Sequence, residues 1–415
     1  MGLSKISYGQ LKVVELFPNG ENYVLKGTQP GYTAELHVVN PEFYRNTILY
    51  GEVGFGEAFV ADNWRSPNLN VTLRWFAQNA QHLPGFSGSS VSKYAMNSLG
   101  FIYRIKHFIR PNTLRVSRKN ISEHYDLGNS FYELMLGKTM AYSSGIYYNA
   151  NNSLDDAQEN KFEVLCKKLQ LNSEDNLLEI GSGWGGFAIY AAKKYKCRIT
   201  TVTISKQQFD YVSAKIIAEK LESLIEVRFA DYRTLKGSYS KIVSIEMLEA
   251  VGIENLDTFF GVCNRLLQKD GLIALQYITY PEAKYEQYLK NNDFIQIHIF
   301  PGSCLLSNLE VLKSVHRTGD LMLVDLESIG QHYATTLRQW RLNIEKEESQ
   351  ILKMGYSDEF LRKWIYYLTY CEAGFAQRAI SDVQIVFSRA NSTKSADFHE
   401  PKLIYRDNLQ HTIEG

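Results

Sequence analysis

The stretch Asn176–Ala188 places four glycines between a short apolar run and an apolar helix. The run Leu177–Ile180 predicts a buried strand, and Phe187–Lys194 predicts the helix. The glycines between them are Gly181, Gly183, Gly185 and Gly186. A strand that turns through glycines into a helix exposes backbone N–H groups beside the positive end of the helix. We therefore predict a nucleotide-type cofactor site here, although glycine-rich turns without a function also exist.

The second predicted strand decides which cofactor the glycines hold. Their spacing satisfies the pattern G-x-G-x-x-G, and a dinucleotide site of this kind needs an acid about 20 residues further on, at the end of the second strand. The second strand is Arg198–Thr203, and Ile204, Ser205 and Lys206 follow it. No acid stands there, so NAD is disfavoured.

The third predicted strand ends at an acid followed by an aromatic residue, Asp231 and Tyr232. The segment order resembles that of Rossmann-like S-adenosylmethionine methyltransferases, in which the third strand ends near the adenine. The resemblance implies that Asp231 accepts a hydrogen bond from the adenine amine while Tyr232 packs on the ring. A surface turn explains the same two residues equally well in isolation. Their position after the third strand favours the cofactor interpretation.

Strands and helices alternate through the larger part of the chain, which predicts an α/β fold with a parallel sheet. The expected strands are 177–180, 198–203, 224–229, 241–246 and 271–279, and the expected helices include 162–169, 187–194, 206–220 and 256–267. The runs 321–326 and 383–387 predict an antiparallel edge. Two aromatic-rich helical stretches, 333–350 and 358–379, stand between those runs and are suited to cover an apolar substrate.

A chain of 415 residues exceeds what one hydrophobic core usually supports, so we expect more than one domain. Residues 1–83 predict a small α+β module. Its expected strands are 11–17 and 34–39, its helices 42–50 and 69–81, and its turn 51–56. Residues 84–119 predict a linker and a basic segment, 120–390 the α/β domain, and 391–415 a polar tail.

The segment from Lys93 to Ser122 contains seven Lys and Arg residues and no acid, interleaved with aromatic and aliphatic side chains. A basic amphipathic segment in a chain with zero net charge suits the surface of an anionic membrane. The alternative is a solvated helix that only connects two domains.

The overall composition indicates in which cellular compartment the protein works and which kinds of partner it has. Zero net charge argues against nucleic acid as a partner. The five cysteines are scattered and form no C-x-x-C pair, which suits a reducing cytosol and predicts neither zinc nor disulfides. No apolar signal core begins the chain and no apolar run is long enough to span a bilayer. We expect a cytoplasmic protein that associates peripherally with the inner face of the membrane.

Seven separated motifs, in order, resemble the cyclopropane-fatty-acid synthase family, whose members use S-adenosylmethionine (SAM). They are His124–Tyr132, Thr139–Ser143, Leu178–Gly186, Ser244–Gly252, Phe300–Gly302, Tyr333–Leu337 and Tyr370–Phe375. The resemblance covers about 119–389 and extends more weakly over 51–64, which is similar to that family's lipid-binding domain. It implies a Rossmann-like SAM-dependent methyltransferase core with a small N-terminal α+β lipid-binding-like domain, and a homodimer joined through that domain.

The resemblance also implies roles for individual residues. The residues implied to hold SAM are Tyr142, Ser143, Gly181, Gly183, Thr203, Ser205, Gln208, Asp231 and Tyr232. Glu249, Ile278 and Tyr333 match a site that holds bicarbonate as the base. Cys371 matches a cysteine sometimes proposed as catalytic.

Two positions depart from the family pattern. Ser144 stands where a cysteine is common, and Gln276 where a histidine is common. A serine offers its backbone N–H and hydroxyl, and the glutamine amide also donates, so an anion pocket can survive without an ionisable histidine or thiol. Taken alone, Gln276 is equally well a polar side chain at a strand end.

The chemistry implied is transfer of the SAM methyl carbon to the double bond of an unsaturated acyl chain in a membrane phospholipid. An unactivated alkene is a weak nucleophile, so the donor must be held in line against it with water excluded. A base then removes a proton from the new methyl group and the ring closes. If the base is misplaced, proton loss from another carbon or reduction gives a methylene or methyl branch instead. Aromatic faces, with Phe300, Tyr333 and Phe375 as candidates, can stabilise the cation. The rival hypotheses are an N-methyltransferase acting on a small amine and a non-enzymatic lipid- or SAM-binding relative.

Overall fold

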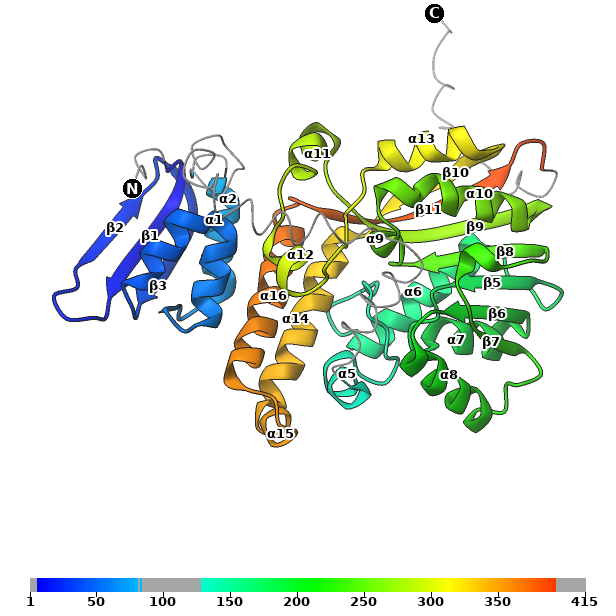
Figure 1. Cartoon of the computed structure of the whole chain (residues 1–415), viewed down its shortest axis with the longest axis horizontal. Helices are drawn as coiled ribbons and strands as arrows, with labels where there is room; N and C mark the ends of the chain where they lie inside the picture. The colour runs from blue at the N-terminus through cyan, green and yellow to red at the C-terminus, as the bar shows by residue number, and fades with distance from the viewer. Residues whose placement is uncertain (1–5, 81–82, 84–127, 393–415) are drawn as a thin grey trace, which may run out of the picture.

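The computed structural model describes residues 6–80, 83 and 128–392. The basic segment, the first four residues of the motif at 124–132 and nearly all of the C-terminal tail lie outside these ranges, so the predictions made for them stay predictions. The described chain forms a small N-terminal unit, a larger α/β unit and a pair of long helices that lie between them (Figure 1).

The N-terminal unit is a four-stranded sheet in the order β2-β1-β3-β4 with two helices on one face. Its elements are β1 Tyr8–Glu15, β2 Asn22–Lys26, β3 Gln29–Val38, β4 Trp64–Arg65, α1 Glu42–Val60 and α2 Leu69–Asn79. The turn expected at 51–56 is wrong, because α1 continues through it. Gly51, at φ 59°, kinks the helix there, and the helix resumes because the residues that follow bury an apolar face around Phe55.

The larger unit contains a seven-stranded sheet in the order β10-β11-β9-β8-β5-β6-β7. Its strands are β5 Asn176–Ile180, β6 Arg198–Thr203, β7 Ile225–Phe229, β8 Tyr239–Ile245, β9 Leu267–Thr279, β10 Leu321–Ser328 and β11 Ser381–Arg389. The first five run parallel, and β11 and β10 add the antiparallel edge that the sequence predicts.

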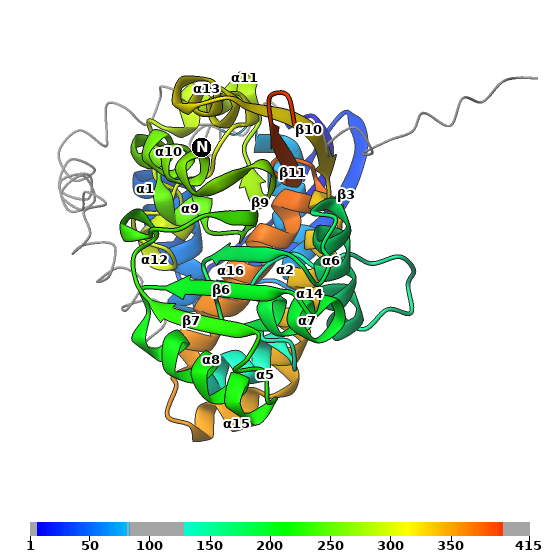
Figure 2. The same cartoon turned by 90° about the vertical axis from the view of Figure 1, so that its right-hand side faces the viewer.

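Helices cover both faces of this sheet (Figure 2). Successive side chains of a strand point to opposite faces. Leu177 therefore packs on the side of α6 (Leu154–Lys168) and α7 (Gly186–Tyr195), and Leu178 on the side of α10 (Leu256–Leu266) and α13 (Asn308–Thr318). The helices of this unit outside the long pair are α5 Asn129–Leu136, α6 Leu154–Lys168, α7 Gly186–Tyr195, α8 Lys206–Ala218, α9 Leu248–Val251, α10 Leu256–Leu266, α11 Glu282–Tyr288, α12 Phe294–His298 and α13 Asn308–Thr318.

The long helices α14 (Gly330–Lys346) and α16 (Asp358–Ala376) join the two units, with the short α15 (Glu348–Lys353) between them (Figure 1). Glu372 of α16 is 1% exposed. It accepts a 3.0 Å hydrogen bond from Nε of Arg338 on α14, and Arg74 of α2 lies 3.7 Å away. This charge cluster, with the buried Glu372 at its centre, joins the N-terminal unit to the helical pair. Within the described ranges, no helix has the length and apolar character that a membrane span needs.

Candidate active site

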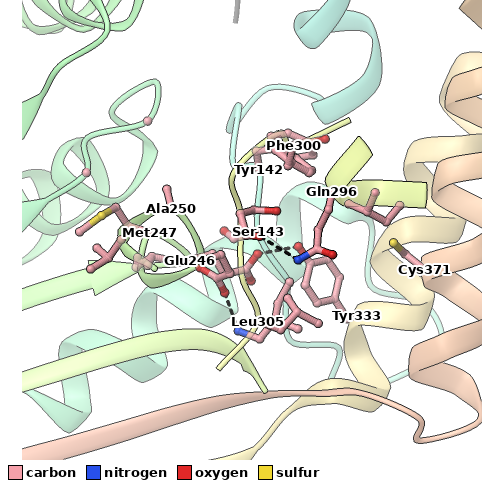
Figure 3. Close-up of a pocket in the computed structure, with 18 of the residues that line it drawn as sticks. Tyr142, Ser143, Glu246, Met247, Ala250, Gln296, Phe300, Leu305, Tyr333 and Cys371 are labelled. Atoms are coloured by element: carbon pink, nitrogen blue, oxygen red, sulfur yellow. Dashed lines mark hydrogen bonds between the residues drawn. The ribbon is translucent and has the colours of Figure 1, made fainter. Parts of the chain in front are cut away.

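A cavity of 520 Å³ opens where the carboxyl ends of the central strands face α14 and α16. At one end it is lined by the glycine loop and the ends of β6 and β8, and at the other by apolar residues of α1 and α2. Figure 3 shows Glu246, Met247 and Ala250 on one side of it, with Tyr333 and Cys371 on the other. The cavity therefore runs from the predicted cofactor site to the N-terminal unit.

The glycine loop adopts backbone angles that favour glycine. Gly181 has φ 95°, Gly183 φ 49° and Gly185 φ 82°. Both Gly181 and Gly183 line the cavity, and a Cβ at Gly183 would meet no atom within 4 Å. The loop leads directly into α7, whose N-cap is Gly185. Backbone N–H groups and a helix N-terminus thus stand beside the cavity, as a cofactor loop requires.

Tyr142 and Ser143 also line the cavity, in the loop before α6. The Tyr142 hydroxyl lies 3.1 Å from the hydroxyl of Tyr367, which connects this loop to α16. The Ser143 hydroxyl accepts a 2.5 Å hydrogen bond from Nζ of Lys161. Burial lowers the pKa of Lys161 to about 8, against the attraction of nearby carboxylates. Sequence reasoning missed Lys161, because a lysine in an amphipathic helix ordinarily faces solvent.

Of the three residues expected after β6, Thr203 and Gln208 line the cavity. The Thr203 hydroxyl donates a 2.8 Å hydrogen bond to Oε1 of Gln208. The hydroxyl of the third residue, Ser205, accepts from the Gln208 backbone N–H and caps the start of α8. Ser205 therefore orients this turn rather than lining the cavity.

Asp231 and Tyr232 line the cavity after β7, as expected of an adenine site. The Asp231 carboxylate is 3% exposed and accepts hydrogen bonds of 2.8 and 2.7 Å from the guanidinium of Arg233. The Tyr232 ring meets Phe259 edge to face, with centroids 5.5 Å apart. Both side chains are held in place by their neighbours, so a ligand meets a preformed surface there.

Glu246, at the end of β8, is the centre of the hydrogen-bond network in the cavity. Its Oε1 accepts from the backbone N–H of Ser144 and from Nε2 of Gln276, both at 2.8 Å. Its Oε2 accepts from the Tyr333 hydroxyl at 2.5 Å. Tyr333 and Glu249, which the resemblance assigns to one anion site, thus bond different partners in the structure. Sequence reasoning missed Glu246, although a second acid in Ile-Glu-Met-Leu-Glu was the available signal.

Ser144 and Gln276 lie behind Glu246 and are fully buried. The Ser144 hydroxyl donates to the carbonyl of Gly145, so only its backbone N–H serves the acid. Nε2 of Gln276 also donates to Oδ2 of Asp382 at 3.0 Å. Neither residue is part of the cavity lining, so both hold Glu246 in position rather than meeting a ligand directly.

Glu249 lies one helical turn further on, in α9. Its Oε1 accepts a 2.6 Å hydrogen bond from the backbone N–H of Ile278, which also lines the cavity. Among the residues that the structure describes, none forms a hydrogen bond with its Oε2. Burial raises the pKa of Glu249 to about 8, and the nearby charge of Glu246 acts in the same direction. Glu249 therefore carries a proton much more readily than an ordinary surface acid.

Cys371 of α16 lines the cavity, but burial raises the pKa of its thiol. A thiol is a nucleophile only as the thiolate, so Cys371 is not activated here. Phe300 lies beside Tyr142, and Phe375 stacks on Tyr333 with centroids 4.5 Å apart. The three aromatic residues that sequence reasoning placed near the substrate all line the cavity.

This fold defines a class of enzyme. The structure superposes on the cyclopropane synthase MmaA2 from Mycobacterium tuberculosis with a TM-score of 0.62 and 26% identity, covering 68% of this chain and 99% of that one. It superposes equally well on the mycolic acid cyclopropane synthase CmaA1 complexed with S-adenosylhomocysteine, at 28% identity over the same shares of the two chains. The chain is a SAM-dependent methyltransferase, and the S-adenosylhomocysteine complex supports SAM as its cofactor.

Sequence comparison gives the family. The mycolic acid cyclopropane synthetase family profile matches residues 112–385, so the chain belongs to that family. It is 32% identical to the tuberculostearic acid methyltransferase UfaA1 of Mycobacterium tuberculosis, over 79% of this chain and 76% of that protein. It is 31% identical to the cyclopropane-fatty-acyl-phospholipid synthase of Escherichia coli K12, over 88% and 90%. The family resemblance expected from the motifs is confirmed.

Proposed function

We propose that this enzyme transfers the methyl carbon of SAM to the double bond of an unsaturated fatty acyl chain of a membrane phospholipid, giving a cyclopropane ring. The observation that carries the proposal is the continuity of the cavity. It joins the glycine loop to the acids at Glu246 and Glu249, and then reaches apolar residues of the N-terminal unit. A long acyl chain fits such a space, with its double bond between the cofactor loop and the acids.

The apolar end of the cavity is built by Phe55 of α1 and by Leu73, Phe76 and Ala77 of α2. These residues are brought to the cavity by the packing of α1 and α2 on α16. Burying the methylenes of an acyl chain against them avoids exposing these groups to water, which would cost about 0.8 kcal/mol per CH₂ group, and so offsets the loss of the chain's contacts with the bilayer. In this proposal the N-terminal unit holds the part of the acyl chain farthest from the reacting bond.

The reacting end of the cavity suits the chemistry. SAM supplies an electrophilic methyl group when it is bound. Glu246, whose carboxylate is held by three hydrogen-bond donors, places negative charge where positive charge develops on the acyl chain, and the faces of Tyr333 and Phe375 add to that stabilisation. The aromatic wall, formed by Phe300, Tyr333 and Phe375, keeps water from capturing the cation. The proton leaves to a base in this acidic cluster, either to bicarbonate, as the resemblance implies, or to a carboxylate of the chain.

A second product is favoured by one specific observation. The relative UfaA1 is named for tuberculostearic acid, whereas the Escherichia coli relative is named as a cyclopropane synthase, and the two are almost equally similar to this chain. The same scaffold therefore supports a branched acyl chain as the alternative product: loss of the proton from a different carbon gives an unsaturated branched chain, and a saturated methyl branch requires in addition a reductant that donates hydride. The place of the base relative to the cation decides between the ring and the branch.

Lipid analysis tests the proposal. The chain is expressed in a host that lacks cyclopropane fatty acids, and its phospholipid acyl chains are measured by mass spectrometry. We expect a gain of about 14 mass units, one CH₂ group, in the unsaturated acyl chains. Proton NMR of the product then separates a ring from a methylene group. Unchanged lipids, with the protein present and folded, would count against the proposal.

We also propose that the basic segment 93–122 brings the enzyme to the inner, anionic face of the membrane. The support is its seven Lys and Arg residues without an acid, mixed with aromatic side chains. Liposome flotation checks this, because binding should require anionic lipid and weaken with salt. A homodimer joined through the N-terminal unit belongs to the same proposal, and analytical ultracentrifugation of the full chain checks it.

A further inference from the structure

We propose that the carboxylate of Glu246 occupies the anion position expected for bicarbonate and is itself the base that takes the proton. This inference rests on the proposed function, because it names the base for that reaction. It makes the enzyme independent of dissolved bicarbonate.

The hydrogen-bond donors of the site leave no place for a second anion. The backbone N–H of Ser144, the amide of Gln276 and the hydroxyl of Tyr333 all bond the Glu246 carboxylate. The remaining N–H of the Gln276 amide bonds Asp382. Ser144, Gln276 and Tyr333 are positions at which the resemblance placed the anion pocket. Bicarbonate therefore does not fit there, because the pocket already contains a carboxylate of the chain.

The backbone of Glu246 gives independent support. Its φ is 48°, in the left-handed region that favours glycine and disfavours a side chain such as glutamate. Its N–H donates to the carbonyl of Gln276 at 2.7 Å, which holds the residue in this conformation. A glutamate in a position suited to glycine indicates that its side chain is used.

Glu246 is also in the right place for the reaction. It lines the cavity directly before Met247, and Met247 packs against Gly181 of the cofactor loop. On its other side it meets Tyr333 and the aromatic wall (Figure 3). The carboxylate thus lies between the methyl donor loop and the residues that surround the acyl chain.

The reaction balances in electrons and protons without another reactant. The alkene electron pair forms the bond to the methyl carbon, and the carbon–sulfur bond breaks with its pair staying on sulfur. Glu246 then takes a proton from the new methyl group, and the released C–H pair closes the ring. Burial raises the pKa of Glu246, which makes its carboxylate a stronger base than in water. The three donors hold its oxygens, which disfavours attack of the carboxylate on the cation.

The test uses two variants and two buffers. Full-length enzyme is assayed with phospholipid vesicles in buffer freed of carbon dioxide and in buffer with added bicarbonate. We expect equal turnover for the unchanged enzyme in both. Glu246→Gln, which keeps the shape but cannot accept the proton, should lower kcat by about 100-fold or more while SAM binding persists. Glu222→Gln, at an exposed position, is the matched control and should behave as the unchanged enzyme.

Glu246→Gly separates a base from a merely structural residue. Glycine suits the backbone angle at this position, so the fold should persist. Removing the Glu246 side chain frees the hydrogen-bond donors of Ser144, Gln276 and Tyr333. Added bicarbonate or formate should then restore part of the lost activity, whereas neither should rescue Glu246→Gln, which still fills the space.

Two results overturn the inference. If the unchanged enzyme methylates lipid only when bicarbonate is present, Glu246 is not the base, although the proposed function stands. If Glu246→Gln retains full turnover in buffer freed of carbon dioxide, the same conclusion follows. Absence of lipid methylation in both buffers, with SAM bound, would overturn the proposed function and the inference together.

Discussion

The hydroxyl of Tyr333 donates a 2.5 Å hydrogen bond to Oε2 of Glu246, joining helix α14 to the end of strand β8. The Tyr333 ring also stacks on Phe375 of α16. One side chain thus connects the acid at the carboxyl end of the sheet to both long helices. Burial raises the pKa of Tyr333 well above its usual value, so it remains a donor throughout the physiological range.

Replacing Tyr333 with phenylalanine tests this connection. The variant keeps the ring and its stacking but removes the donor from a buried carboxylate, a loss of about 1.5–3 kcal/mol. When this whole loss raises the activation free energy, kcat falls by about 10- to 100-fold. Steady-state kinetics and SAM titration check it, with SAM affinity expected to stay constant. The control is Tyr148→Phe, at a side chain that is 64% exposed, and equal losses in the two variants would contradict the prediction.

Gly181→Ala tests the cofactor loop. Gly181 has φ 95°, and a Cβ there would come within 3.1 Å of the Met247 side chain. The left-handed backbone alone makes alanine less stable by about 1–2 kcal/mol, and the loop must shift to relieve it. We expect SAM to bind at least about tenfold more weakly, as isothermal titration calorimetry would measure.

The matched control for that variant is Gly261→Ala, in the middle of α10. A Cβ at Gly261 would meet nothing within 4 Å, and the residue is helical. Alanine is therefore expected to stabilise the protein by up to about 1 kcal/mol without changing SAM affinity. Unchanged SAM binding by Gly181→Ala would show that the cofactor lies elsewhere.

Ala77→Trp tests the apolar end of the cavity. Ala77 of α2 lines it, so an indole there shortens the space for an acyl chain. Turnover of long-chain lipid should fall about tenfold relative to shorter-chain lipid, with SAM binding unchanged. Competition between the two lipids, analysed by mass spectrometry, measures this ratio. Ile217→Trp, at a position 63% exposed on α8, controls for the introduced tryptophan. A chain-length preference that stays constant would exclude the N-terminal unit from substrate binding.

The core of the fold was predictable because its strands carry continuous apolar runs. Leu177–Ile180 and its neighbours must be covered on both faces, and only a parallel sheet between helices does that. The helix through 51–56 was not predictable, because three glycines in six residues ordinarily indicate a turn. In the structure Gly54 and Gly56 are buried, and a Cβ at Gly56 would come within 2.7 Å of Tyr366. Close packing of α1 explains these small residues.

The candidate site was predictable at Asp231, which follows the third predicted strand, and at Glu249, which the family resemblance implies. It was not predictable where the partner comes from a distant segment. Glu246 is held by groups from positions 144, 276 and 333, and only the folded chain shows that they converge on it. The same holds for Lys161, whose partner Ser143 lies in a separate loop.

Glu179 makes stability depend on pH. Its carboxyl is 2% exposed in strand β5, and burial raises its pKa to about 8 from a usual value of 4.5. Because the folded-state pKa is the higher one, the folded chain binds more protons than the unfolded chain between these two values. The contribution of Glu179 to stability is therefore fully present below pH 4.5 and is lost as pH rises through about 8.

Glu179→Gln should remove this dependence, since an amide fills the same space without releasing a proton. Between pH 5 and pH 8 the unfolding free energy of the unchanged protein should fall more steeply with pH than that of the variant. The difference between the two slopes should be up to about 1.4 kcal/mol per pH unit, the contribution of this one group. Urea unfolding at several pH values measures the two slopes. The variant should lose stability to the missing carboxyl at low pH and gain relative to the unchanged protein at pH 8. Parallel slopes would contradict the prediction, because they would mean that Glu179 is ionised in the folded chain. The compensating charge would then be that of Lys161, which favours the carboxylate form of Glu179.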